Sequence, residues 1–222
     1  MSTLDDLIYY CEEKEPAGAL MLTGEWGCGK TYLIEHDLSE KMKETHIILR
    51  ISLFGIETIG TLNKNVKKQW IDKCHGGLGK LLKYNKINKK IANGVYSASK
   101  IPKPVKDVML SINLEDFISI KPKVNNKKVI LVFDDLERTK LDKTDVLGII
   151  NEYCENLHFN TIIVTNEERI SYESSSECMK YSIIKEKIVE RTTKYIPKCD
   201  EIIHSLLYDG EWFDNKYNKF LF

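Results

Sequence analysis

Residues 24–31 carry the most specific chemical signal in this 222-residue chain. Their sequence, Gly-Glu-Trp-Gly-Cys-Gly-Lys-Thr, fits the pattern G-x-x-x-x-G-K-[ST], whose glycines let successive backbone N–H groups form a cradle for phosphate. Lys30 is placed to neutralise the β- and γ-phosphates of a nucleotide, and the Thr31 hydroxyl to ligate Mg²⁺. The alternative is a glycine-rich turn that binds nothing. The predicted nucleotide-binding residues are Gly24, Glu25, Trp26, Gly27, Cys28, Gly29, Lys30 and Thr31.

A second signal lies much later in the chain, where two carboxylates follow an apolar run. Residues 129–133 predict a buried parallel strand, and Asp134 and Asp135 come directly after it. The ligand crevice of an open α/β sheet lies at the carboxyl ends of its strands. We therefore expect Asp134 to help hold Mg²⁺ and Asp135 to polarise the attacking water. A strand followed by a plain acidic turn is the alternative.

Two further polar residues are candidate catalytic residues. Asn166 follows the strand expected at 159–165 and could hydrogen-bond the γ-phosphate or the lytic water, although a turn-forming Asn is the competing interpretation. Arg191 precedes a short last strand expected near residues 195–196 and could stabilise developing charge.

The segments around these residues predict an α/β fold with a parallel sheet. An apolar run, the glycine-rich loop, an amphipathic segment and a β-branched run form a βαβ unit, and such crossovers are right-handed. A first helix over residues 3–14 would pack beside the nucleotide cleft, where Leu4, Ile8 or Tyr9 could instead contact adenine. The expected elements are strands at 17–23, 45–53 and 127–133 and helices at 31–41, 56–73 and 142–156.

Charge is balanced over the whole chain but uneven along it. Lys plus Arg and Asp plus Glu number 33 each, whereas residues 61–128 hold sixteen lysines, no arginine and four acids. Regular alternation also fails at about 74–126, which we interpret as a mostly helical basic insertion. A solvated lysine-rich face, a surface for anionic lipid or a protein partner, and a nucleic-acid contact are the open alternatives. The lack of arginine and the sparse aromatic residues count against nucleic acid.

The cysteine pattern and hydropathy favour a cytoplasmic protein. The six cysteines are scattered without a C-x-x-C pair, which is typical of reduced thiols rather than a disulfide framework or a zinc site. The first residues lack the features of a secretory signal, and no apolar run approaches the roughly 18 residues of a membrane span. We expect no transmembrane helix, with peripheral association with an anionic membrane left open.

Together these motifs resemble the KAP-type P-loop NTPases of bacteria. Residues 24–31 are similar to that family's GEWGxGKT/S loop, residues 132–138 to its hhhDDLDR strand end, and Val-Thr-Asn at 164–166 to a third stretch. The resemblance implies a three-layer P-loop fold with strand order 5-1-4-3-2. It also implies that Lys30 and Thr31 bind phosphate and Mg²⁺, that Asp134 binds Mg²⁺ and that Asp135 is the base. Asn166 would be the sensor, and Arg138 would stabilise the transferred phosphate.

Three departures from the family pattern affect these expectations. Glu137 stands where the family usually has Asp, a change from which we expect little effect. The basic insertion lacks the membrane helices that family members often carry there. Little sequence follows Asp200, so we expect the C-terminal helical part of this P-loop domain, residues 1–222, to be short or truncated after about 200.

The sequence therefore predicts a Mg²⁺-dependent ATP-binding protein, an ATPase acting as a conformational or assembly switch. ATP is favoured over GTP because no N-K-x-D tetrapeptide is present. A nucleotide-gated interaction module with little hydrolysis is an alternative, motivated by the aromatic residues near the C-terminal end. An ATPase that uses the lysine-rich insertion on nucleic acid is another. Turnover could need a protein partner or a second copy of the chain, and the resemblance suggests a bacterial or phage-conflict setting.

Overall fold

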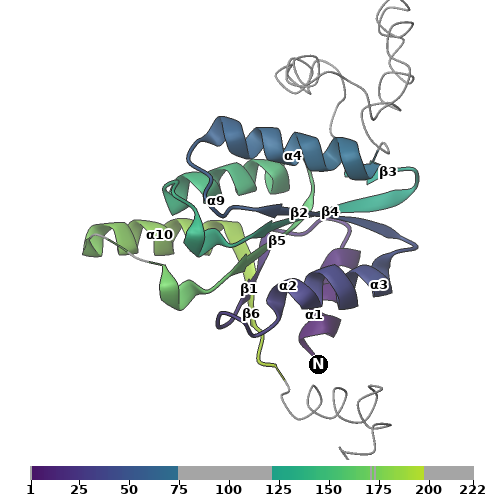
Figure 1. The fold of residues 1–222 in the computed structure, drawn as a ribbon, viewed down its shortest axis with the longest axis horizontal. Coiled ribbons are helices and arrows are strands. Elements are labelled where there is room, and N and C mark those ends of the chain that lie inside the picture. Colours follow the sequence, from purple (N-terminus) through teal and green to yellow (C-terminus); the bar gives the residue numbers. More distant parts are fainter. Residues whose placement is uncertain (1, 75–121, 171, 173, 198–222) are drawn as a thin grey trace, which may run out of the picture.

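A computed structural model describes residues 2–74, 122–170, 172 and 174–197 of the protein. Within these residues a parallel sheet runs in the order β2-β4-β5-β1-β6 (Figure 1). If the parallel strands alone are numbered along the chain, this order read from the other edge is 5-1-4-3-2, as predicted. The strands are β1 (Ala19–Thr23), β2 (His46–Ser52), β4 (Lys127–Asp134), β5 (Asn160–Thr165) and β6 (Val189–Lys194).

A short antiparallel strand, β3 (Lys123–Val124), extends the sheet before β4. Asn125 and Asn126 connect the two strands with φ values of 51° and 65°. Two consecutive positive φ values are typical of the tight turns that match the twist of a β-hairpin, and Asn tolerates them well. Residues 122–126 of the predicted mostly helical insertion are therefore not helical. Residues 75–121 lie outside the described residues, so the rest of that prediction stays a prediction.

Helices cover both faces of the sheet, which gives three layers (Figure 1). One face carries α1 (Thr3–Glu12) and the helix after the glycine-rich loop, which is α2 (Lys30–Tyr32), a π-helical turn η1 (Leu33–Leu38) and α3 (Ser39–Met42). The other face carries α4 (Ile59–Cys74), α9 (Lys143–Asn151) with its π-helical end η4 (Glu152–Asn156), and α10 (Ser175–Ile188). Two 3₁₀ turns follow central strands, η3 (Leu136–Arg138) and η5 (Glu167–Arg169).

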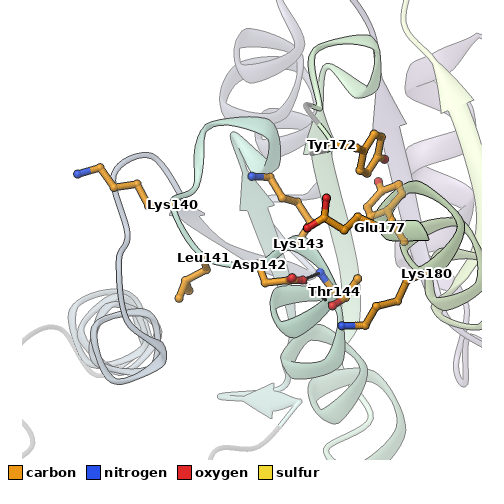
Figure 2. Close-up of a pocket in the computed structure, with 9 residues that line it drawn as sticks. Lys140, Leu141, Asp142, Lys143, Thr144, Tyr172, Glu177 and Lys180 are labelled. Atoms are coloured by element: carbon orange, nitrogen blue, oxygen red, sulfur yellow. Dashed lines mark hydrogen bonds between the residues drawn. The ribbon is translucent and has the colours of Figure 1, made fainter. Parts of the chain in front are cut away.

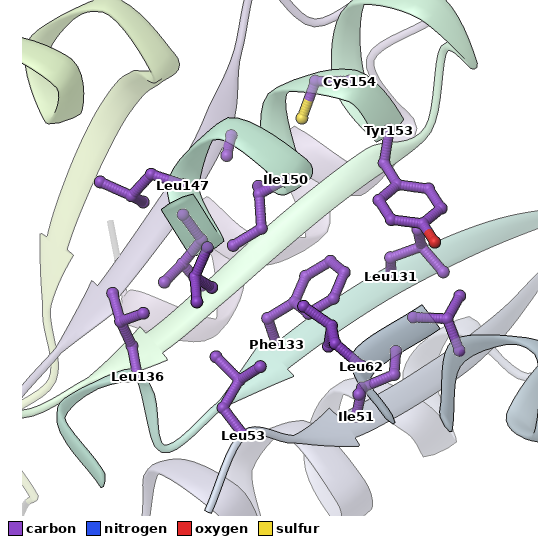
Figure 3. Close-up of a cluster of buried hydrophobic side chains, with 14 of the residues drawn as sticks. Ile51, Leu53, Leu62, Leu131, Phe133, Leu136, Leu147, Ile150, Tyr153 and Cys154 are labelled. Carbon is purple, nitrogen blue, oxygen red and sulfur yellow. The ribbon is translucent and has the colours of Figure 1, made fainter. Parts of the chain in front are cut away.

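The central strand β4 is buried on both faces, as its continuous apolar run predicts. Because side chains alternate along a strand, Leu131 and Phe133 join the core under α4 and α9, shown in Figure 3. Ile130 and Val132 join a second core under α1 and the α2–α3 helix. The strand is thereby fixed in register, and its carboxyl end delivers Asp134 to the edge of the sheet.

Helix α1 is held at both ends by side-chain hydrogen bonds. Ser2 and Asp5 form a capping box at its start. At its end, backbone carbonyls of the last turn accept hydrogen bonds from Asn160 of β5 and Lys128 of β4. The Tyr10 hydroxyl is fully buried and lies 2.9 Å from both the Gly18 and Thr161 backbone carbonyls.

We expect Tyr10→Phe to lower the free energy of unfolding by about 2 kcal/mol. The Tyr10 hydroxyl also accepts a hydrogen bond from the Thr161 backbone N–H at 2.9 Å. Without the hydroxyl this N–H stays buried and unpaired, which is the costly case. Chemical denaturation measures the change, with Tyr9→Phe as a control on the same helix, because Tyr9 is exposed. An equal loss in both variants would contradict the assigned contribution of Tyr10.

The last strand lies earlier than predicted. Residues 183–188 belong to α10, and β6 occupies Val189–Lys194 instead of residues 195–196. Its residues alternate between half-buried and exposed, and β6 is the last strand on its side of the sheet formed by the described residues. Strand β6 therefore consists mostly of polar residues such as Thr and Arg. It lacks the apolar pattern on which the prediction relied.

Candidate functional site

The glycine-rich loop joins the carboxyl end of β1 to the start of α2. Gly29 has φ +98°, a left-handed conformation that favours glycine, and it stands directly before Lys30. Gly24 is required for a different reason: a Cβ atom there would lie 2.8 Å from the Tyr195 carbonyl oxygen. Tyr195, which the sequence interpretation missed, follows β6 and packs against the loop, where burial raises the pKa of its hydroxyl.

The Lys30 side chain bends back and contacts the glycine-rich loop. Its ammonium nitrogen lies 2.7 Å from the backbone carbonyl oxygens of Gly24 and of Glu25. The side chain is nearly buried, so these carbonyls supply the partners that the charge needs. The loop thus holds a cation at its centre, at the amino end of a helix, which is the arrangement that binds phosphate.

Thr31 and Asp134 meet at the carboxyl edge of the sheet, as the sequence predicts. The Thr31 hydroxyl donates a hydrogen bond of 3.0 Å to Asp134 Oδ2, and Asp134 is only 3% exposed. Within the described residues, no cluster of three or more His, Cys, Asp and Glu side chains could hold a metal. Mg²⁺ is commonly bound through one or two protein oxygens together with water and substrate phosphates. A hydroxyl and a carboxylate that already touch therefore fit this ion.

Arg50 of β2 is a member of the site that the sequence interpretation missed. Its Nε lies 2.7 Å from Asp134 Oδ2, and one terminal nitrogen lies 3.1 Å from Glu35 Oε1 on the helix after the loop. Burial opposes the charge on Arg50, but the hydrogen bond that Arg50 donates to Asp134 and the neighbouring carboxylates raise the pKa of the guanidinium above its ordinary value. The arginine is thus held between two acids beside the predicted metal ligand.

Asp135, the predicted base, has a strained backbone and an oriented side chain. Its φ and ψ of 64° and 40° lie in the left-handed region, which is uncommon outside glycine and often marks functional sites. The Ser52 hydroxyl at the end of β2 donates a 3.0 Å hydrogen bond to one carboxylate oxygen. Arg138 lies 3.5 Å from the other oxygen. Ser52 is a further residue that the sequence interpretation missed.

Trp26 connects the glycine-rich loop to two strand ends. Its indole N–H donates a 2.7 Å hydrogen bond to Glu137, whose other carboxylate oxygen accepts one of 3.0 Å from Thr165. The guanidinium groups of Arg138 and Arg169 lie 6.0 Å and 5.4 Å from the centre of the Trp26 ring system. Glu137 therefore contributes more to the site than the sequence indicated, because its two carboxylate oxygens connect the glycine-rich loop to the end of β5.

Asn166 is brought to the same edge, whereas Arg191 is not. Thr165 pairs with Thr23, so Asn166 follows β5 at the level where Gly24 follows β1. Arg191 pairs with Leu20, three residues before the end of β1. It donates a 2.8 Å hydrogen bond to Asp6 of α1 and lies over the Tyr9 ring, so it stabilises the docking of α1.

A separate pocket of about 310 Å³ lies between the starts of α9 and α10 (Figure 2). It contains none of the predicted site residues. Asp142 caps α9 there by accepting a hydrogen bond from the Thr144 backbone N–H, and Lys143 donates to the Thr139 carbonyl oxygen. The residues that line it are Lys140, Leu141, Asp142, Lys143, Thr144, Tyr172, Glu177, Lys180 and Tyr181.

In the described part of the chain, the cysteines and the helices bear on the expectations of reduced thiols and of no transmembrane helix. There, Cys11, Cys28, Cys74, Cys154 and Cys178 are free thiols. Burial raises the pKa of Cys11 and of Cys74 to about 12, so both are protonated near neutral pH. None of the described helices has the length and apolar character needed to cross a bilayer.

Several solved structures resemble this chain at low sequence identity. Drosophila ORC bound to GC-rich DNA and Cdc6 matches with 9% identity and a TM-score of 0.45, over 92% of this chain and 30% of that chain. Aeropyrum pernix ORC1 in complex with DNA matches with 14% identity and a TM-score of 0.43, over 93% of this chain and 46% of that one. DnaI matches with 15% identity and a TM-score of 0.39, over 86% and 81%.

A match to a protein family covers almost the whole chain. No curated protein matches it significantly. The KAP family P-loop domain matches residues 1–218, which include the glycine-rich loop, both aspartates and every strand described above. The chain therefore belongs to the KAP family of P-loop domains, a class of nucleotide-binding proteins.

Proposed function

We propose that this protein binds Mg·ATP at the carboxyl edge of its sheet and hydrolyses it slowly, as a conformational or assembly switch. The single observation that supports this best is the 3.0 Å hydrogen bond between Thr31 and Asp134, which are far apart in the sequence. It joins the last residue of the phosphate loop to the carboxylate at the end of β4. A P-loop ATPase needs this pair on one side of the phosphates.

The first step is binding of the triphosphate by the loop. Backbone N–H groups of residues 24–29 and the start of the α2–α3 helix would bind the phosphates, and Lys30 would exchange its loop carbonyls for phosphate oxygens. Thr31 and Asp134 would hold Mg²⁺, which would supply positive charge to the β- and γ-phosphates when bound. The nearly buried position of Asp134 strengthens its electrostatic contribution.

The second step is attack by water on the γ-phosphate, in which a bond from the water oxygen to the γ-phosphorus forms, the bond to the bridging oxygen breaks, and ADP leaves. Asp135 accepts the proton of the water, oriented by the Ser52 hydroxyl that already contacts it. Asn166 at the neighbouring strand end holds the water or the γ-phosphate. Arg138, whose side chain is 45% exposed, leaves Asp135 to stabilise charge on the transferred phosphate.

Asp134→Asn tests the metal site of this proposal. We expect Mg²⁺ to tighten ATP binding at least about tenfold in the wild-type chain and by less than about twofold in the variant, because the amide lacks the charge. Titration calorimetry with ATP, with and without Mg²⁺, gives both ratios. Asp142→Asn is the matched control, because Asn also caps helices and Asp142 lies at the start of α9. A Mg²⁺ effect of equal size in Asp134→Asn and wild type would contradict the assignment.

A second candidate function is a nucleotide-gated interaction module with little hydrolysis. Three large aromatic side chains around the glycine-rich loop and the end of β2 are exposed: Trp26 (58%), Phe54 (60%) and Tyr32 (61%). Exposed apolar groups that surround a ligand site are typical of surfaces that contact a partner. In that case bound ATP would change this surface, and a protein partner or a second copy of the chain would detect the change.

A further inference from the structure

Arg50 occupies a position that the proposed reaction leaves unexplained. It lies in β2 opposite Val132 of β4, two residues before the end of its strand. From there its guanidinium bridges Asp134 at 2.7 Å and Glu35 at 3.1 Å. The Arg50 side chain is 30% exposed, so both contacts are partly shielded from water.

The two oxygens of Asp134 are both engaged by donors of the protein. Oδ2 accepts from the Thr31 hydroxyl and from Arg50 Nε, and Oδ1 accepts from the Asp135 backbone N–H at 2.9 Å. The hydrogen bond from Thr31 is compatible with metal binding, because a hydroxyl can donate its proton to a carboxylate while its oxygen ligates a cation. The contact with Arg50 differs, because it places a full positive charge where a divalent cation would sit.

We propose that Arg50 is a positioning residue that holds Asp134 in place of Mg²⁺, so that the cation enters the site only together with the triphosphate. This inference rests on the function proposed above. A cation arriving alone must compete with a charge-assisted hydrogen bond at a nearly buried carboxylate. The phosphates add negative charge, which offsets the repulsion between the cation and the guanidinium and offers Arg50 other oxygens. The protein would thereby bind Mg·ATP but bind free Mg²⁺ only weakly.

A purely structural ion pair is the competing interpretation, and it predicts a different outcome. The contact with the exposed Glu35 is of the kind that contributes little. Loss of a structural pair would lower stability but leave cation binding without nucleotide unchanged. Cation affinity is therefore a measurement that separates the two interpretations.

The experiment measures Mn²⁺ binding to the full chain without nucleotide, from the spin-resonance signal of free Mn²⁺. We expect Arg50→Gln to bind Mn²⁺ roughly tenfold more tightly than the wild-type chain, because one positive charge near the site is gone. Arg50→Lys keeps the charge and should stay within about threefold of wild type. The matched control is Arg191→Gln, which removes the same charge from an arginine held by Asp6 and Glu13 at the other end of the sheet. Adding Asp134→Asn to Arg50→Gln should abolish the gain.

Several results would overturn the inference. One is that Arg50→Gln binds Mn²⁺ no more tightly than the wild-type chain. Another is that Arg191→Gln gains as much Mn²⁺ affinity as Arg50→Gln. If Arg50→Gln does not fold, the wild-type chain is measured instead. Wild-type Mn²⁺ binding that is as tight without ATP as with it, and that Asp134→Asn abolishes, contradicts the proposal. ATP binding by the wild-type chain is measured alongside. Failure to bind ATP with either cation refutes the proposed function, whereas normal ATP binding without the Arg50 effect refutes this inference alone.

Discussion

Replacing Lys30 by Ala should weaken ATP binding at least about 100-fold in the presence of Mg²⁺. Lys30 is the cation at the centre of the loop, and its ammonium now contacts two backbone carbonyls at 2.7 Å. Those carbonyl contacts are weaker than contacts with phosphate, because a carbonyl oxygen carries a partial charge whereas the phosphate oxygens carry full negative charge. Without Lys30 the phosphates lose this interaction and face the loop carbonyls directly. Calorimetric titration with ATP measures the loss.

Two comparisons separate this charge effect from damage to the loop. Lys30→Met keeps the length of the aliphatic stem and should lose as much affinity as Lys30→Ala. Lys41→Ala removes the same charge from an exposed position near the end of the same helix and should change affinity by less than about twofold. If Lys30→Ala and Lys30→Met both bind ATP as the wild-type chain does, the loop is not a phosphate site and the proposed function is wrong.

The central features of the site were predictable because they depend on local patterns and one rule of sheet geometry. The glycines and Lys30 follow from the spacing in residues 24–31. The contact between Thr31 and Asp134 follows because carboxyl ends of parallel strands meet at one edge. The strand order could be stated before the structure because the family resemblance implied it.

Arg50 and Ser52 were missed although the sequence held a signal for both. In β2, Leu49 and Ile51 face the core under α4, so Arg50 and Ser52 must face the other side. A charged residue near the carboxyl end of an otherwise apolar strand is the same signal that identified Asp134. Residues 45–53 were interpreted only as a β-branched strand, so the alternation of side chains within it was not used.

Other features could not be predicted because they depend on pairings between distant segments. Glu137 was expected to have little effect, yet its longer side chain contacts both Trp26 and Thr165. Arg191 was predicted to be a catalytic residue that precedes a strand near residues 195–196, but it lies within β6. The register of β6 against β1 sets Arg191 opposite Leu20 instead, beside Asp6. The residue pattern specifies register only weakly in a strand as polar as β6, so its register depends on packing against the rest of the fold.

Asp135→Asn should reduce phosphate release at least about 100-fold while ATP affinity stays within about twofold of wild type. The change is unusually specific here, because Asn tolerates the left-handed backbone of residue 135 better than other non-glycine residues do. The amide oxygen can still accept the hydrogen bond from Ser52. The variant therefore removes the charge and basicity of the side chain and little else, and it should retain ATP without turnover.

Ser52→Ala provides the graded comparison, since it removes only the hydroxyl that orients Asp135 and should slow release by about tenfold. Single-turnover release of labelled phosphate and retention of ATP on a filter measure the two quantities for each variant. Undiminished release in Asp135→Asn would exclude Asp135 as the base. If the wild-type chain binds ATP but releases no phosphate, and Asp135→Asn changes nothing, the gated interaction module is the better account. The exposed surface around Trp26 and Phe54 would then be the part of the protein on which ATP acts.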